Sequence, residues 1–202
     1  MKANFRLFKE NHCTQSEGFT LIEVMIASVI MIVGLLSLMA LFAKALSAVQ
    51  SSQDDQIAKQ KSRETLEAIY AARNDGMISF SDIANVPNGI FPAGFNKMYL
   101  PGSNGIPGST SDTNILDRVI LPGKDGVVQT ALNASSPAGD DVLVPLSNFQ
   151  RQIDIAPVKD AQNNNNPFLA KITVTIRVNP GSMYQRDYQT TGYVAATQST
   201  TQ

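Results

Sequence analysis

The feature that most constrains this chain is an apolar run close to its N-terminus. Residues 19–43 read FTLIEVMIASVIMIVGLLSLMALFA and contain a single charged residue, Glu23. As a helix rising 1.5 Å per residue, this run would be about 37 Å long, more than the ~30 Å hydrocarbon core of a bilayer. It is too long for the apolar region of a secretory signal, about 7–15 residues, and no A-x-A cleavage site follows it. A buried core helix rarely has so uniformly apolar a circumference. We therefore predict a membrane-spanning helix over residues 19–43.

The charges before this run predict its orientation. Residues 1–18 carry three basic and two acidic side chains. This modest positive excess favours a cytoplasmic N-terminus, which would place the chain after Ala43 outside the cytoplasm.

The composition excludes several kinds of active site. The chain has one His and one Cys, His12 and Cys13, and both precede the apolar run. An intrachain disulfide, a Cys/His zinc site and the common Ser-His-Asp or Cys-His catalytic groups are therefore excluded from the rest of the chain. The net charge is −1 and the basic residues are scattered, which argues against direct nucleic-acid binding. We expect no enzyme activity, no bound metal and no cofactor.

Glu23 is the anomaly within the apolar run. A carboxylate in a membrane helix costs about 2–3 kcal/mol near the centre and less near an end, and it usually has a function. In the alternative interpretation, Glu23 lies in the first helical turn and its side chain reaches the lipid headgroups. Its position alone does not separate these two interpretations.

The residues around Glu23 favour a function. Residues 18–23, GFTLIE, follow a short hydrophilic leader and open a long apolar helix. This arrangement resembles the processing motif of type IV prepilins and the related pseudopilins, and the resemblance covers approximately residues 1–50. The continuation through residues 24–27 and 34–36 is most similar to minor pilins of the pilus modification type.

The resemblance implies a processing pathway and a set of partners. A membrane prepilin peptidase would cleave between Gly18 and Phe19 and N-methylate the new N-terminus at Phe19. Glu23 would then contact the cationic amine of a neighbouring subunit in the filament, which makes it a subunit-docking residue. The implied partners are the prepilin peptidase, other pilin subunits and the cytoplasmic membrane.

The helical pattern continues beyond the apolar run. Residues 44–73 contain neither Gly nor Pro and are rich in Ala, Gln, Lys and Glu, which favour helix. Leu66, Ile69, Tyr70 and Arg73 recur at helical spacing, so residues 44–75 are predicted to form an amphipathic continuation of the helix. Residues 76–117 are rich in Pro and Gly and are predicted to be an irregular connection.

Residues 118–202 are predicted to form an antiparallel sheet. Short strand candidates are residues 118–121, 127–132 and 142–146. Stronger alternation occurs in residues 149–155, in residues 172–178, and in residues 184–195, where Tyr184, Tyr188 and Val194 would share a face. The loop at residues 160–166 offers oxygen ligands but lacks the second carboxylate and closing Glu of a calcium loop, so we interpret it as a polar hairpin turn. The predicted fold class is α+β, with the long helix lying across the sheet.

These features predict a minor type IV pilin precursor. Residues 1–18 would be a cleaved leader, and the mature chain would pass from the cytoplasmic membrane into an extracellular pilus. The alternative in the same family is a type II secretion pseudopilin in a periplasmic fibre. An alternative of another class is a membrane-tethered binding or enzymatic domain that does not assemble.

Overall fold

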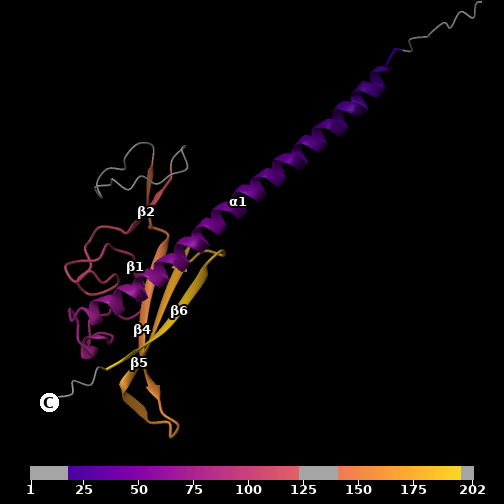
Figure 1. Cartoon of the computed structure of the whole chain (residues 1–202). Coiled ribbons are helices and arrows are strands. Elements are labelled where there is room, and N and C mark those ends of the chain that lie inside the picture. Colours follow the sequence, from indigo (N-terminus) through magenta and orange to yellow (C-terminus); the bar gives the residue numbers. More distant parts are fainter. Residues whose placement is uncertain (1–17, 123–140, 197–202) are drawn as a thin grey trace, which may run out of the picture. The chain divides into compact units, whose positions relative to one another are not determined.

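A computed structural model describes residues 18–122 and 141–196 of the chain. The elements in chain order are α1 (Leu21–Asn74), the short 3₁₀ helix η1 (Phe80–Asp82), β1 (Asn96–Lys97), β2 (Arg118–Leu121), β3 (Val142–Pro145), β4 (Phe149–Lys159), β5 (Asn165–Val178) and β6 (Arg186–Ala195) (Figure 1). One long N-terminal helix followed by antiparallel strands confirms the predicted α+β class. The chain divides after Val49 into two compact units.

The first unit contains the apolar part of α1. Its large apolar side chains, from Phe19 to Val49, are exposed on every side of the helix. Within the described residues, α1 is the one helix whose length and apolar composition are sufficient to cross a membrane. An apolar surface of this extent needs lipid or other helices around it.

The second unit contains the sheets. A four-stranded antiparallel sheet has the order β1-β4-β5-β6, and β2 pairs with β3 in a separate two-stranded sheet. Ile153 of β4 lies opposite Val174 of β5, which lies opposite Thr190 of β6. The strand predicted at residues 118–121 is confirmed as β2, whereas the candidate at residues 127–132 lies outside the described residues.

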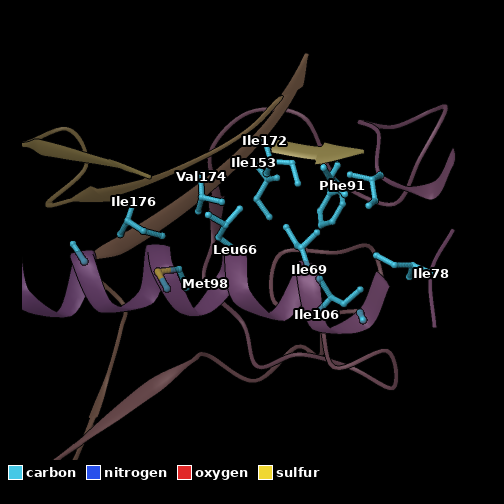
Figure 2. Packing of buried hydrophobic residues seen from close by; sticks show 14 of the residues in the cluster. Leu66, Ile69, Ile78, Phe91, Met98, Ile106, Ile153, Ile172, Val174 and Ile176 are labelled. Carbon is cyan, nitrogen blue, oxygen red and sulfur yellow. The ribbon is translucent and has the colours of Figure 1, made fainter. Parts of the chain in front are cut away.

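The core lies between the sheet and the second half of α1. On β5 the side chains of Ile172, Val174, Ile176 and Val178 alternate with polar ones and are fully buried. Figure 2 shows Ile172, Val174 and Ile176 on the side of β5 that faces Leu66 and Ile69 of α1, as the alternation and the helical stripe predicted. Tyr70 of α1 packs at the margin of the same cluster.

The irregular segment after α1 contributes to the core more than its composition predicted. Phe91, Met98 and Ile106 are fully buried in the same cluster, and Figure 2 shows them beside the α1 residues. Their backbone is arranged by turns and by isolated bridges, such as Asn85 with Phe91 and Tyr99 with Leu116. The segment is therefore part of the packed head.

Within the second unit, α1 and β6 run in the same direction. Polar contacts join successive positions along both elements: Asp55 with Arg186, Ser62 with Thr190, Tyr70 with the carbonyl of Tyr193, and Arg73 with the carbonyl of Ala195. At Gly192 the two elements lie in close contact, since an added Cβ would overlap the Tyr70 hydroxyl and stand 2.9 Å from Leu66. The absence of a side chain at this position allows the helix to pack directly on the strand.

One detail of the predicted strands is wrong. Tyr184 does not join the buried face, because two successive turns extend the β5–β6 connection and β6 begins only at Arg186. The Tyr184 side chain is 78% exposed. Thr175 faces away from the core but is also covered, with 7% exposed, because it lies on a central strand between two neighbours.

The core packing gives a stability prediction. Ile176→Ala in the fragment of residues 50–202 is expected to lower the free energy of unfolding by about 2–5 kcal/mol, since it leaves a cavity in a fully buried cluster. The control is Thr173→Ala, on the outer face of the same strand. It should lower the free energy of unfolding by much less. Urea unfolding measures both, and equal losses would show that the assigned core face of β5 is wrong.

Candidate functional site

The predicted cleavage position lies just before the helix. Leu21 is the first residue of α1, so the Gly18–Phe19 peptide lies outside the helical hydrogen-bond ladder. None of the residues that the structure describes lies within 4 Å of the position a Cβ would take at Gly18. The Phe19 side chain is 81% exposed. A peptide that lies outside the helix and is exposed in this way is accessible to a peptidase.

Thr20 and Glu23 form the start of the helix. The Thr20 side-chain oxygen accepts a hydrogen bond from the Glu23 N–H at 3.3 Å, as expected of a residue that caps a helix N-terminus. Glu23 therefore lies in the first turn, where the helix dipole favours a negative charge. Within residues 18–122 and 141–196, its carboxylate takes part in no hydrogen bond or ion pair, so it is available to a partner from another chain.

The second candidate site is a buried ion pair in the head. Arg151 of β4 is on the core face, and its side chain is only 2% exposed. Its Nη2 atom contacts Asp112 Oδ2 at 3.1 Å, and its Nη1 atom donates weakly to Thr65 of α1. Gly108 covers the guanidinium, since a Cβ there would lie 2.6 Å from Arg151 Nε. This close packing leaves the Nε atom without a hydrogen-bond partner.

Burial dominates the electrostatics of this pair. Loss of hydration raises the pKa of the Asp112 carboxyl, against the lowering effects of the Gly108 N–H and of Arg151. Burial likewise lowers the pKa of the Arg151 guanidinium, although Asp112 and Asp117 act in the opposite direction. In both side chains burial disfavours the charged form, so formation of this ion pair carries a cost in lost hydration.

A second buried cation joins the helix to the strand region. Lys61 of α1 contacts Asp117 at 3.0 Å and Glu64 at 3.1 Å. Lys61 and Arg151 are thus two charged side chains buried between α1 and the strands. The other buried residues of α1 are small or apolar. Sequence reasoning missed both cations as core residues. For Arg151 a signal existed, because it alternates in phase with Phe149 and Ile153.

The described part of the head contains one pocket beside the buried arginine. This pocket of about 350 Å³ lies beside Arg151 and is lined by Lys97, Tyr99 and the hydroxyl-bearing residues 109, 110 and 113. It contains neither His nor Cys. Groups of three or more His, Cys, Asp or Glu side chains able to hold a metal are absent from the residues that the structure describes.

The polar loop at residues 160–166 is a hairpin turn. The Asp160 carboxylate accepts hydrogen bonds from the backbone N–H groups of Gln162 and Asn164 at 2.9 and 2.8 Å. The oxygens that sequence analysis considered as calcium ligands therefore include one that stabilises the turn itself.

Comparison with known protein families gives a match at the N-terminal site. A family model described as the prokaryotic N-terminal methylation motif matches residues 13–40. No curated protein and no solved structure matches the chain. The matched region includes the candidate cleavage position, Glu23 and residues 19–40 of the apolar run. Together with the apolar helix, it supports a membrane-anchored precursor of the type IV pilin or pseudopilin kind, processed by a prepilin peptidase and with a structural role.

Proposed function

We propose that this chain is a minor type IV pilin precursor that is cleaved between Gly18 and Phe19, methylated at Phe19 and assembled into a pilus. The observation that carries the proposal is the methylation motif at the start of a helix whose apolar surface is exposed on all sides. Such a surface is stable in a bilayer before assembly and in a bundle of similar helices after it.

The proposal divides the chain into parts with separate tasks. Residues 1–18 are the leader, residues 19–43 span the cytoplasmic membrane and later form the filament core, and residues 44–75 join that helix to the head. Residues 76–117 and 118–202 form the irregular and sheet parts of the head. The N-terminus lies in the cytoplasm before cleavage, and the head lies on the outer side of the membrane.

The choice of a pilus over a secretion fibre rests on the similarity of residues 24–27 and 34–36 to minor pilins. Isolation of sheared surface filaments followed by mass spectrometry tests it. The expected result is a peptide from the head together with an N-methylated peptide that begins at Phe19. Recovery of the mature chain from periplasmic fibres alone would favour the pseudopilin, and recovery only from membranes would favour the tethered domain.

Glu23 separates an assembling subunit from a simple anchor. Glu23→Leu is expected to permit membrane insertion and cleavage but to lower incorporation into filaments by at least about tenfold, the effect of about 1.4 kcal/mol per docking step. The reason is that a carboxylate in an apolar helix bundle selects a register in which it meets a cationic N-terminus. The measurement is the ratio of filament-bound to membrane-bound protein.

Two further variants serve as controls for this experiment. Glu23→Gln keeps the shape of the side chain but removes its charge, and it should behave like Glu23→Leu. Glu23→Asp keeps the charge and should retain part of the incorporation. Normal incorporation of both Glu23→Leu and Glu23→Gln would remove the docking role and leave Glu23 as a headgroup-facing residue.

A further inference from the structure

The two edges of the four-stranded sheet differ in how their outward backbone groups are satisfied. On β4, the backbone of Arg151 is paired with β1. The Asn85 side chain donates to the Ile153 carbonyl at 2.7 Å and accepts from the Ile155 N–H at 3.0 Å. Pro157, the next outward position, has no N–H. The β4 edge is therefore protected against pairing with another strand from Arg151 to Pro157.

The β6 edge is open in its first half. The Ala196 N–H donates to the Phe168 carbonyl, which continues the pairing of β6 with β5. Directly opposite residues of an antiparallel pair are hydrogen-bonded at every second position, so the even-numbered residues of β6 are those bonded to β5. Asp187, Gln189 and Thr191 therefore direct their N–H and C=O groups away from β5. Within the part of the chain that the structure describes, these groups have no hydrogen-bond partner.

The second half of this edge is covered by α1. The outward carbonyls of Tyr193 and Ala195 accept hydrogen bonds from the side chains of Tyr70 and Arg73. Residues 187–191 remain uncovered, which is about 17 Å of strand. We propose that this open edge, residues 187–191, pairs with an extended segment of a different pilin subunit. The inference rests on the proposed assembly into a pilus and names a surface that contacts a partner there.

Main-chain chemistry determines the kind of partner. The open edge presents N–H and C=O groups at every second residue, about 6.8 Å apart, and another extended chain presents complementary groups at the same spacing. Proteins usually protect such an edge with Lys or Pro. Residues 187–191, DYQTT, contain neither, and the Asp187 charge is engaged by Arg177 at 2.7 Å. The open edge is therefore suited to strand pairing.

The flank of α1 next to the open edge is basic. Lys59 is exposed and lies 5.6 Å from the centre of the Tyr188 ring of β6. Arg63 is also exposed and follows four residues later, so it lies on the same side of the helix. Neither cation forms an ion pair with the residues that the structure describes. Glu67, one turn further on, is level with the covered half of β6. We expect the partner segment to carry an acidic side chain on the side that faces α1.

A second copy of this chain fits the open edge less well. Its β4 edge is already covered by β1 and the Asn85 side chain. If two β6 strands paired in antiparallel fashion, the two-fold axis would place both helices on the same face of the joined sheet, with their basic flanks side by side. Like charges in that position would oppose the pairing. A different subunit with an acidic segment avoids this repulsion.

Proline at position 189 tests main-chain pairing. Gln189→Pro removes an outward N–H and places a ring on the open edge, but it leaves the β5–β6 hydrogen bonds in place. The full-length variant should be cleaved after Gly18 and be present in the membrane in normal amounts. Its ratio of filament-bound to membrane-bound protein should fall at least about tenfold, because the pairing loses a hydrogen bond and meets the ring. Limited proteolysis of the membrane-bound form checks that the head is folded.

Gln189→Ala is the matched control. It removes the same side chain but keeps the N–H, so it should be incorporated normally. Normal incorporation of folded Gln189→Pro would overturn the open-edge contact alone. An equal loss in Gln189→Ala would overturn it as well, since a side-chain contact would then be responsible. Absence of the unaltered chain from filaments would overturn the proposed function and this inference with it.

Cross-linking identifies the partner and does not depend on the proline variant. Cys13 is the one cysteine of the chain and lies in the leader, so Gln189→Cys supplies a single thiol after cleavage. Benzophenone maleimide is attached to this thiol in sheared filaments. Irradiation should join it to a different pilin, in a segment that contains Asp or Glu, which mass spectrometry identifies. A cross-link to a second copy alone, a cross-linked segment without Asp or Glu, or no cross-link would overturn the inference.

Discussion

Gly18→Leu is expected to leave the chain uncleaved, so that essentially all of it keeps its leader and none enters filaments. A peptidase that acts beside a bilayer must bind the backbone of the Gly18–Phe19 peptide closely, and only a residue without a bulky side chain permits that approach. Among residues 18–122 and 141–196, nothing lies within 4 Å of an added Cβ at Gly18. The defect is therefore expected in processing and not in folding. N-terminal sequencing of the membrane and filament fractions measures it.

Gly34→Ala provides the matched control for this experiment. Gly34 also has nothing within 4 Å of an added Cβ, but it lies inside α1. This variant should be cleaved normally and begin at Phe19. Cleavage of Gly18→Leu at the normal position, or a filament form that begins at Met1, would contradict the assigned processing site.

Arg151→Met is expected to lower the free energy of unfolding of the head by about 3–5 kcal/mol. Arg151 is buried and holds Asp112 at 3.1 Å, so its removal leaves a buried carboxylate without its counter-charge. Asp112 would keep the hydrogen bond from the Gly108 N–H at 2.8 Å and the one from the Ser109 backbone, neither of which carries a full positive charge. Urea unfolding of the fragment of residues 50–202 gives the free energy of unfolding for each variant.

The double variant Arg151→Met/Asp112→Leu distinguishes a lost charge pair from a lost contact. It removes both charges, and it should recover much of the stability that Arg151→Met loses. Arg177→Met breaks an exposed ion pair on the outer face of the sheet and should have a far smaller effect. Equal stability of the single and double variants would show that packing by the arginine stem, and not charge balance, determines the cost.

Sequence periodicity was sufficient to predict which side chains are buried in the regular helix and strands. The alternation from Ile172 to Val178 predicted the buried face of β5, and the helical spacing of Leu66 and Ile69 predicted the face of α1 that covers it. The N-terminal motif likewise depends on local sequence alone. The structure adds the placement of Glu23 in the first helical turn and the accessibility of the peptide before it.

Periodicity failed where burial depends on contacts between distant segments. Phe91, Met98 and Ile106 belong to a segment without a repeating backbone geometry, so no spacing rule could assign them to the core. Arg151 has the correct phase for the buried face, but its charge argued for the surface. Only Asp112, 39 positions earlier in the chain, explains its burial.

The parallel arrangement of α1 and β6 also determines how the head bears mechanical load. Tension applied along α1 from its N-terminal end acts along the strand, so it shears the contacts from Asp55–Arg186 to Arg73–Ala195 together and does not open them one after another. The packing of Leu66 against Gly192 lies in the middle of this series and resists sliding as well. Because several contacts must break in the same step, forced separation of the helix from the sheet has a high kinetic barrier. This arrangement keeps the sheet attached to the helix when the helix is pulled lengthwise.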